Sequence, residues 1–182
     1  MTRFGSIIVA ALAIWLAGIA AAAAADPENT LYLDLKDGRV VIEMRPDLAP
    51  NHVKQIKALT RKGFYDGIAF HRVIEGFMAQ TGDPKGDGTG GSGNKIRAEF
   101  SGEPHVAGTV SMARTADPNS ADSQFFIMFA PAPGLDRQYT VWGKVVQGMQ
   151  FVNDIKRGDR ARNGAVSNPD RIVRMRVAAD VK

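Results

Sequence analysis

The chain has 182 residues, of which 45% are hydrophobic and 23% are charged, and its formal net charge at pH 7 is +4. This length indicates one globular domain with a short additional segment. The mild charge, without a block of Lys and Arg interleaved with aromatic residues, argues against nucleic-acid binding. Cysteine is absent and the three histidines are not at metal-ligand spacing, so we expect no metal site.

Residues 1–25 have the features of a secretory signal peptide. Arg3 stands near the start, an apolar run follows, and an alanine tract precedes Asp26. We predict cleavage near Ala25, which leaves residues 26–182 as a single domain with 22 basic and 19 acidic side chains. The apolar run is also long enough to span a bilayer, so an uncleaved membrane anchor is the alternative. Its high alanine and glycine content and the lack of a basic stop-transfer cluster favour cleavage.

The predicted domain begins with a β-hairpin and a helix. Residues 30–46, TLYLDLKDGRVVIEMRP, alternate between apolar and polar residues on both sides of Asp37-Gly38, a strong hairpin signal. Residues 49–63 carry apolar side chains at helical spacing. Asn51 is the expected N-cap of this helix, and Gly63 stands where it should end.

Residues 69–83, AFHRVIEGFMAQTGD, place one arginine among apolar side chains. Alternation predicts that Arg72 shares a strand face with Phe70, and that His71 faces the other way as a packed core histidine. A guanidinium is rarely buried without a partner. Arg72 is therefore either part of a structural ion pair, with Glu99 or Asp122 as candidates, or it projects into a cleft.

The rest of the chain predicts further short strands and one more helix. Residues 82–94 contain six glycines and a proline and are expected to form a loop. The predicted strands lie within 105–113, 123–130, 139–146 and 170–179, and the second helix lies within 148–158. About eight short strands separated by turns argue against a doubly wound α/β sheet. We predict an all-β dominated fold, a closed eight-stranded antiparallel β-barrel capped by two α-helices.

One motif match and one group of serines suggest functions that the surrounding sequence does not favour. Residues 86–91, GDGTGG, match G-x-G-x-x-G, but no βαβ unit surrounds them and no helix follows directly, so we expect a surface loop and not a nucleotide site. Ser111, Ser120 and Ser123 are not in a G-x-S-x-G elbow, which argues against a serine hydrolase.

Four segments carry a more specific signal: FHRVIEGFMAQTGD at 70–83, GTVSMAR at 108–114, SQFFIMF at 123–129 and VWGKVVQGM at 141–149. In this order and spacing the chain resembles the cyclophilin-type peptidyl-prolyl cis-trans isomerases, over essentially all of 30–177. It looks most like the short bacterial members. The resemblance implies an eight-stranded antiparallel barrel capped by two helices, and a rotamase activity on X-Pro bonds without cofactor.

The resemblance also implies roles for individual residues. The catalytic arginine of the family falls on Arg72, and the glutamines that position the arginine and the substrate fall on Gln80 and Gln124. The backbone contact to the residue before proline falls on Ala113 and Arg114. The hydrophobic proline pocket and its rim fall on Phe77, Met78, Phe126, Leu135 and Tyr139.

The sequence departs from the family pattern at three of these positions. The tryptophan at the pocket edge is Gly134 here, which puts tight cyclosporin binding in doubt because an indole donor and wall are missing. The histidine on the pocket rim is Tyr139, which keeps a ring with a polar tip. The asparagine after the alanine is Arg114, a change of little effect if the contact is made by the main chain.

The chemistry fits these residue types. Amide rotation breaks no bond, so no nucleophile is needed, and a charged donor aimed at the imide nitrogen stabilises the twisted state in which resonance is lost. We expect a monomeric enzyme that acts on proline-containing unfolded or partly folded polypeptides. Given the predicted signal peptide, we expect it in the periplasm, where the mature protein binds neither nucleic acid nor membrane. The alternative is a proline-segment binding module or chaperone with little catalysis.

Overall fold

The computed structural model describes residues 26–181, and the predicted signal peptide lies outside these residues. In this part of the chain no helix combines the length and the apolar character that a membrane crossing requires. The helices are α1 (Pro50–Arg61) and the short α2 (Met149–Asn153). Four 3₁₀ turns complete the helical structure: η1 (Pro27–Asn29), η2 (Pro133–Leu135), η3 (Arg160–Arg162) and η4 (Ala178–Asp180).

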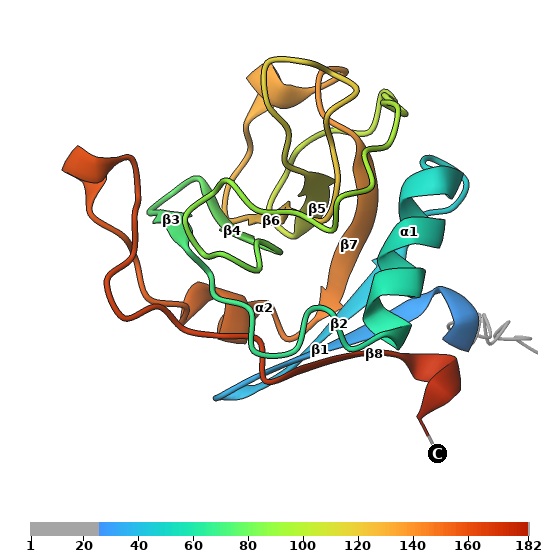
Figure 1. The fold of residues 1–182 in the computed structure, drawn as a ribbon, viewed down its shortest axis with the longest axis horizontal. Helices are drawn as coiled ribbons and strands as arrows, with labels where there is room; N and C mark the ends of the chain where they lie inside the picture. Colours follow the sequence, from blue (N-terminus) through green and yellow to red (C-terminus); the bar gives the residue numbers. More distant parts are fainter. Residues whose placement is uncertain (1–25, 182) are drawn as a thin grey trace, which may run out of the picture.

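Eight strands form one antiparallel sheet, and Figure 1 labels each of them. They are β1 (Thr30–Leu35), β2 (Gly38–Met44), β3 (Arg72–Ile74), β4 (Met78–Thr81), β5 (Thr109–Met112), β6 (Phe125–Met128), β7 (Val141–Gln147) and β8 (Arg174–Val177). Their order across the sheet is β3-β4-β6-β5-β7-β2-β1-β8. The predicted eight strands and two helices are confirmed, and the predicted hairpin is β1-β2, with Leu35 opposite Gly38.

The closed barrel is not confirmed, because the sheet is an open half-barrel whose end strands β3 and β8 do not pair with each other. The irregular segment 158–172 lies against the free edge of β3 instead. Its pairing there is limited to isolated bridges, Ala165 with Arg72 of β3 and Arg171 with Ala69 ahead of β3, and to a few main-chain hydrogen bonds, including those with Val73. Left-handed backbone at Asn163 and Gly164 prevents this segment from continuing as a strand, so no regular ladder closes the gap.

Helix α1 begins at Pro50, with Ala49 as the residue before it, so the prediction of Asn51 as N-cap is wrong. The cap comes from Glu99, whose carboxylate accepts hydrogen bonds from the main-chain nitrogens of Asn51 and His52 at 3.1 Å. A carboxylate at this position satisfies free N–H groups and complements the helix dipole. The helix ends before Gly63, as predicted, and packs against β8.

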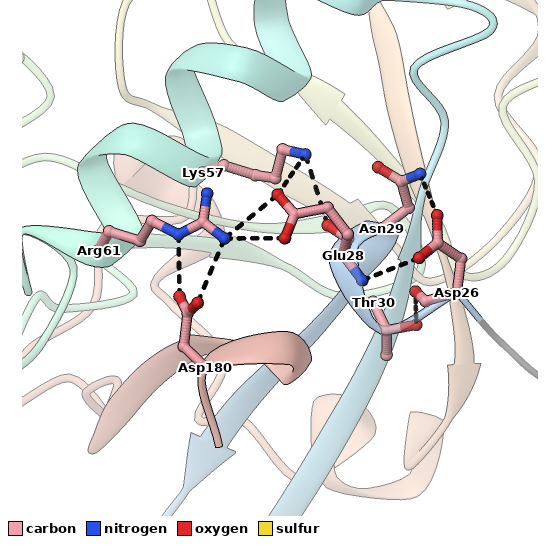
Figure 2. Close-up of polar contacts among 7 residues, drawn as sticks. All are labelled: Asp26, Glu28, Asn29, Thr30, Lys57, Arg61 and Asp180. Carbon is pink, nitrogen blue, oxygen red and sulfur yellow. Dashed lines mark hydrogen bonds and ion pairs between the residues drawn. The ribbon is translucent and has the colours of Figure 1, made fainter. Parts of the chain in front are cut away.

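The two ends of the described chain are tied to α1 (Figure 2). Arg61 donates from Nε to Asp180 at 2.9 Å and from Nη2 to Glu28 at 2.9 Å. Lys57 adds a bond from Nζ to Glu28 at 3.0 Å. In the view of Figure 1 these ends lie on one side of the molecule, whereas segment 158–172 lies on the other.

Buried side chains form two clusters. The main core fills the inside of the half-barrel and includes Phe125, Trp142 and Val73, all with no exposed surface. A second, smaller cluster is built on Met78 and Phe126. Phe125 and Phe126 are neighbours in β6, and they face opposite sides of the strand, as the sequence predicted.

Candidate active site

A cavity of about 630 Å³ opens beside the second cluster. It lies between β3, β4 and β6 on one side and the segments around η2 and η3 on the other. Nine of the ten residues predicted for the site line it: Arg72, Phe77, Met78, Gln80, Ala113, Arg114, Phe126, Leu135 and Tyr139. The structure therefore brings together residues that are up to 67 positions apart in the sequence.

Arg72 opens β3 and faces Gln80 of β4 across the pairing of the two strands. Its Nη1 donates to Gln80 Oε1 at 3.1 Å, while Nε and Nη2 donate to the main-chain oxygen and Oδ1 of Asn163, both at 3.0 Å. Burial lowers the pKa of Arg72, and a guanidinium still remains charged at neutral pH. The structural ion pair is ruled out, because Glu99 caps α1 and Asp122 accepts from Ser92 and Gly93.

Gln80 continues the hydrogen-bond chain away from the arginine. Its Nε2 donates to Gln124 Oε1 at 2.9 Å. Gln124 Nε2 in turn donates to the main-chain oxygens of Gly88 and Gly90 at 3.0 and 2.8 Å. Gln124 thus lies behind Gln80 with its amide fully engaged, and it joins the arginine to the 82–94 loop. This position suits a brace better than the direct substrate contact that the resemblance implied.

The apolar end of the cavity has the buried, aromatic lining that suits a proline ring. Met78 and Phe126 are 1% and 5% exposed, and Tyr139 stands edge-on to Phe126 with ring centroids 5.8 Å apart. Gly76 has a φ of 71°, and this turn lets both Phe77 and Met78 reach the cavity although they are adjacent.

The rim is held by Arg114 and the end of β5. The guanidinium of Arg114 lies 4.5 Å from the centre of the Tyr139 ring and donates to the main-chain oxygen of Gln138. The main-chain nitrogen of Ala113 donates to Gln124 O at 2.9 Å, which fixes the strand end beside the cavity. Arg114 therefore anchors the rim tyrosine through its side chain, whatever its main chain contributes.

A serine-histidine-aspartate series lies directly behind the apolar end. His105 Nδ1 is 3.0 Å from Asp136 Oδ1, and Nε2 is 3.1 Å from Ser111 Oγ. A hydrolase needs an accessible nucleophile, but Ser111 has no exposed surface and its hydroxyl donates to Thr140 O. The His105 ring is stacked on Phe126, with centroids 6.2 Å apart. The series therefore supports the pocket and offers no hydrolytic site.

Comparison with known proteins gives the family. The family model described as cyclophilin type peptidyl-prolyl cis-trans isomerase/CLD matches residues 30–177. The chain belongs to the cyclophilin-type peptidyl-prolyl cis-trans isomerases. It is an enzyme of that class, and the resemblance, the isomerase function and the class predicted from the sequence are confirmed.

Relatives and solved structures support this assignment. The chain is 57% identical to the probable peptidyl-prolyl cis-trans isomerase of Brucella suis over 94% of this chain and 93% of the relative. The chain is 45% identical to peptidyl-prolyl cis-trans isomerase B of Bacillus subtilis, over 72% of this chain and 93% of the relative. Cyclophilin AquaCyp293 from Hirschia baltica has a TM-score of 0.77 at 31% identity, over 86% of this chain and 76% of that chain. A Cryptosporidium parvum cyclophilin, crystallised in the presence of the dipeptide Ala-Pro, has a TM-score of 0.74 at 27% identity, over 81% of this chain and 98% of that chain.

The cyclophilin cavity also contains residues that were not predicted for the site. His71 lines it, although alternation placed His71 on the opposite face from Arg72. Phe70 and Val73 are three positions apart, yet both lie in the main core, so side chains do not alternate regularly between two faces across this stretch. The chain before β3 is irregular, and regular alternation begins only at the first residue of β3. Asn163 was also missed, and the Asn163-Gly164 turn dipeptide is the signal that could have indicated a loop there.

Proposed function

We propose that this cyclophilin is exported, loses residues 1–25 and accelerates X-Pro isomerisation in folding periplasmic proteins. The leader-like composition of residues 1–25 supports export, and the Ala-Pro dipeptide present with the Cryptosporidium parvum relative supports proline-containing peptides as substrates. The observation that carries the catalytic part is the position of Arg72, a cation with neutral hydrogen-bond partners beside an apolar pocket.

The reaction requires that the peptide bond before proline loses its resonance. This resonance gives a barrier of about 18–20 kcal/mol, and uncatalysed exchange takes about tens to hundreds of seconds. In the twisted state the imide nitrogen regains a localised lone pair. Arg72 is placed to donate a hydrogen bond to that nitrogen, an interaction that is available only as the bond twists and so stabilises the transition state selectively.

The apolar end of the cavity supplies the second part of catalysis. Phe77, Met78, Phe126 and Leu135 hold the proline ring still while the preceding carbonyl rotates. The main chain at 113–114 aligns the residue before proline, and Tyr139 closes the rim. Gln80 keeps Arg72 oriented and is itself held by Gln124.

The size of the rate acceleration requires both the hydrogen bond from Arg72 and the apolar pocket that holds the proline ring. An acceleration from about 100 seconds to about a millisecond is about 10⁵-fold, or about 7 kcal/mol. One hydrogen bond from a charged donor supplies about 1.5–3 kcal/mol. The remaining stabilisation comes from the fixed proline ring, from orientation of the peptide and from exclusion of water at the imide.

The test is isomerisation of a short Ala-Pro peptide by the purified protein and by Arg72→Ala and Arg72→Lys variants. We expect Arg72→Ala to lower kcat/KM by about 10- to 10²-fold, the equivalent of that one hydrogen bond. Arg72→Lys should recover only part of this loss, because an ammonium lacks the planar fork of donors. Equal rates for the wild type and Arg72→Ala would overturn the mechanism. Export is tested separately, by sequencing the N-terminus of the protein recovered from a periplasmic extract, where Asp26 is expected.

A further inference from the structure

The turn after η3 lies against the side chain of Arg72. Asn163 ends η3 in the left-handed region, with φ 53° and ψ 35°. Among residues other than glycine, asparagine adopts this conformation most readily. In this position its main-chain oxygen and its side-chain Oδ1 point in the same direction, and each accepts one hydrogen bond from the guanidinium at 3.0 Å. A single residue thus binds two of the three nitrogens of Arg72.

The main chain next to Asn163 is fixed to β3. Val73 N donates to Gly164 O at 2.8 Å, and Gly158 N donates to Val73 O at 2.9 Å. The two glycines are in direct contact, since a Cβ added at Gly158 would lie 1.8 Å from Gly164 O. The turn is therefore attached to the same strand that carries Arg72, and Asn163 keeps its position relative to the guanidinium.

The three acceptors around Arg72 are all neutral. They are Oε1 of Gln80 and the two oxygens of Asn163, and among the described residues no carboxylate forms a hydrogen bond or ion pair with Arg72. A carboxylate here would orient the guanidinium equally well but would offset its charge. Neutral acceptors fix the direction of the N–H groups and leave the positive charge for the imide nitrogen.

We propose that Asn163 is a positioning residue for the isomerase reaction, which acts by aiming the guanidinium of Arg72 through its side-chain oxygen. The inference rests on the proposed role of Arg72. Three of the five guanidinium N–H groups are held by Gln80 and Asn163, which leaves one on Nη1 and one on Nη2 for the substrate. Without the Oδ1 acceptor, the guanidinium keeps two of its three hydrogen bonds and is held less firmly, and the transition state loses more than the bound substrate does.

The experiment compares Asn163→Gly with Asn168→Gly in the purified full-length protein. Glycine tolerates φ > 0 and keeps the main-chain oxygen at 163, so Asn163→Gly removes only the Oδ1 acceptor. Asn168 is a matched control, because it is also exposed, has a φ of 50° and lies away from the cavity. We expect Asn163→Gly to lower kcat by about tenfold with KM within about twofold, and Asn168→Gly to change neither.

A cycle with Arg72→Ala separates this inference from the proposed function. Asn163→Gly should have no further effect on kcat/KM in the Arg72→Ala protein, because the group that it positions is gone. If Arg72→Ala retains wild-type activity, the proposed role of Arg72 is wrong. If Arg72→Ala is inactive but Asn163→Gly retains wild-type kcat, the role of Asn163 is wrong and that of Arg72 stands. An equal loss of kcat in both backgrounds, or an equal loss with Asn168→Gly, would also overturn the positioning role.

Discussion

Phe125 and Phe126 are consecutive residues of β6 whose rings belong to different parts of the molecule. The Phe125 ring lies edge-on to Tyr65 and Trp142, with centroids 5.6 and 5.4 Å away, inside the main core. The Phe126 ring lines the cavity and stands edge-on to Tyr139. The strand thus places a core residue and a candidate substrate contact one position apart, and this gives a sharp test of the site.

We expect Phe126→Ala to weaken substrate binding and Phe125→Ala to weaken the fold. Loss of the pocket ring removes about 2 kcal/mol of apolar contact with proline, or about thirtyfold in kcat/KM, mainly through a higher KM. Loss of the core ring costs about 3–5 kcal/mol of unfolding free energy. Peptide isomerisation and urea unfolding of both variants measure the two effects. An unchanged KM in Phe126→Ala would show that this ring does not hold proline.

Stability should fall in mildly acidic solution because burial lowers the pKa of two histidines, His52 and His71. Burial lowers the pKa of His52, although Glu99 lies 2.7 Å from its Nδ1, and burial likewise lowers the pKa of His71. Each histidine takes up a proton more readily in the unfolded chain, where its pKa is about 6.5. Their contribution is therefore complete above about pH 6.5 and is lost as the pH falls through the folded pKa, by up to about 1.4 kcal/mol per pH unit for each.

Urea unfolding at pH 7, 6 and 5 measures this loss. His52→Asn removes one of the two histidines with a lowered pKa and keeps a donor that can reach Glu99, so its unfolding midpoint should fall less steeply with pH than that of the wild type. Parallel slopes for the two proteins between pH 7 and 5 would exclude His52 as a source of the acid sensitivity.

Much of the fold could be predicted because its signals are local. The alternation around Asp37-Gly38 gives the register of β1 and β2 directly, and the adjacent Phe125 and Phe126 had to face opposite sides of one strand. The resemblance then supplied the site. Nine of the ten residues that it named line one cavity, because the family motif already encodes which strands are neighbours.

The features that escaped prediction depend on contacts between distant segments. Asn51 looks like an N-cap in the sequence, but Glu99, 48 residues further along, already satisfies its main-chain nitrogen. The contact of Asn163 with Arg72 spans 91 residues. The open side of the half-barrel is equally nonlocal, because it depends on how segment 158–172 meets a strand of only three residues.

Arg61 should keep both ends of the described chain well ordered, and its removal should not affect catalysis. Its bonds to Asp180 and Glu28, visible in Figure 2, raise its pKa and are exposed to solvent. We expect Arg61→Ala to accelerate hydrogen exchange at the amides of Thr30 and Val181, which close η1 and η4, because the turns lose their attachment to α1. Hydrogen exchange followed by mass spectrometry measures this.

The matched control for Arg61→Ala is Arg39→Ala, which removes an exposed ion pair with Asp34 at a different place. It should leave exchange at Thr30 and Val181 unchanged. High salt should shift the wild type towards the Arg61→Ala behaviour, because exposed pairs are screened. A slower Ala-Pro isomerisation in Arg61→Ala would contradict the separation of the chain ends from the active site.

Gly134 makes the pocket edge open, and this predicts weak cyclosporin binding. Where the family has a tryptophan, no atom lies within 4 Å of a Cβ built at Gly134, and its backbone in η2 is helical. A larger side chain therefore fits without strain. We expect Gly134→Trp to restore an indole wall and donor next to Leu135, and to strengthen cyclosporin inhibition by at least about tenfold. The kcat/KM for a short Ala-Pro peptide should stay within about twofold, since Gly134 is not among the residues that line the cavity.

Gly134→Ala is the control for Gly134→Trp, because it makes the same change of backbone freedom without adding a ring. Cyclosporin inhibition of Ala-Pro isomerisation is measured for the wild type and both variants under identical conditions. The indole should strengthen inhibition and the methyl group should not, because only the indole adds an N–H donor and an apolar wall. Equal inhibition of Gly134→Trp and Gly134→Ala would show that Gly134 does not set the affinity for cyclosporin, and Tyr139 would be the next residue to change.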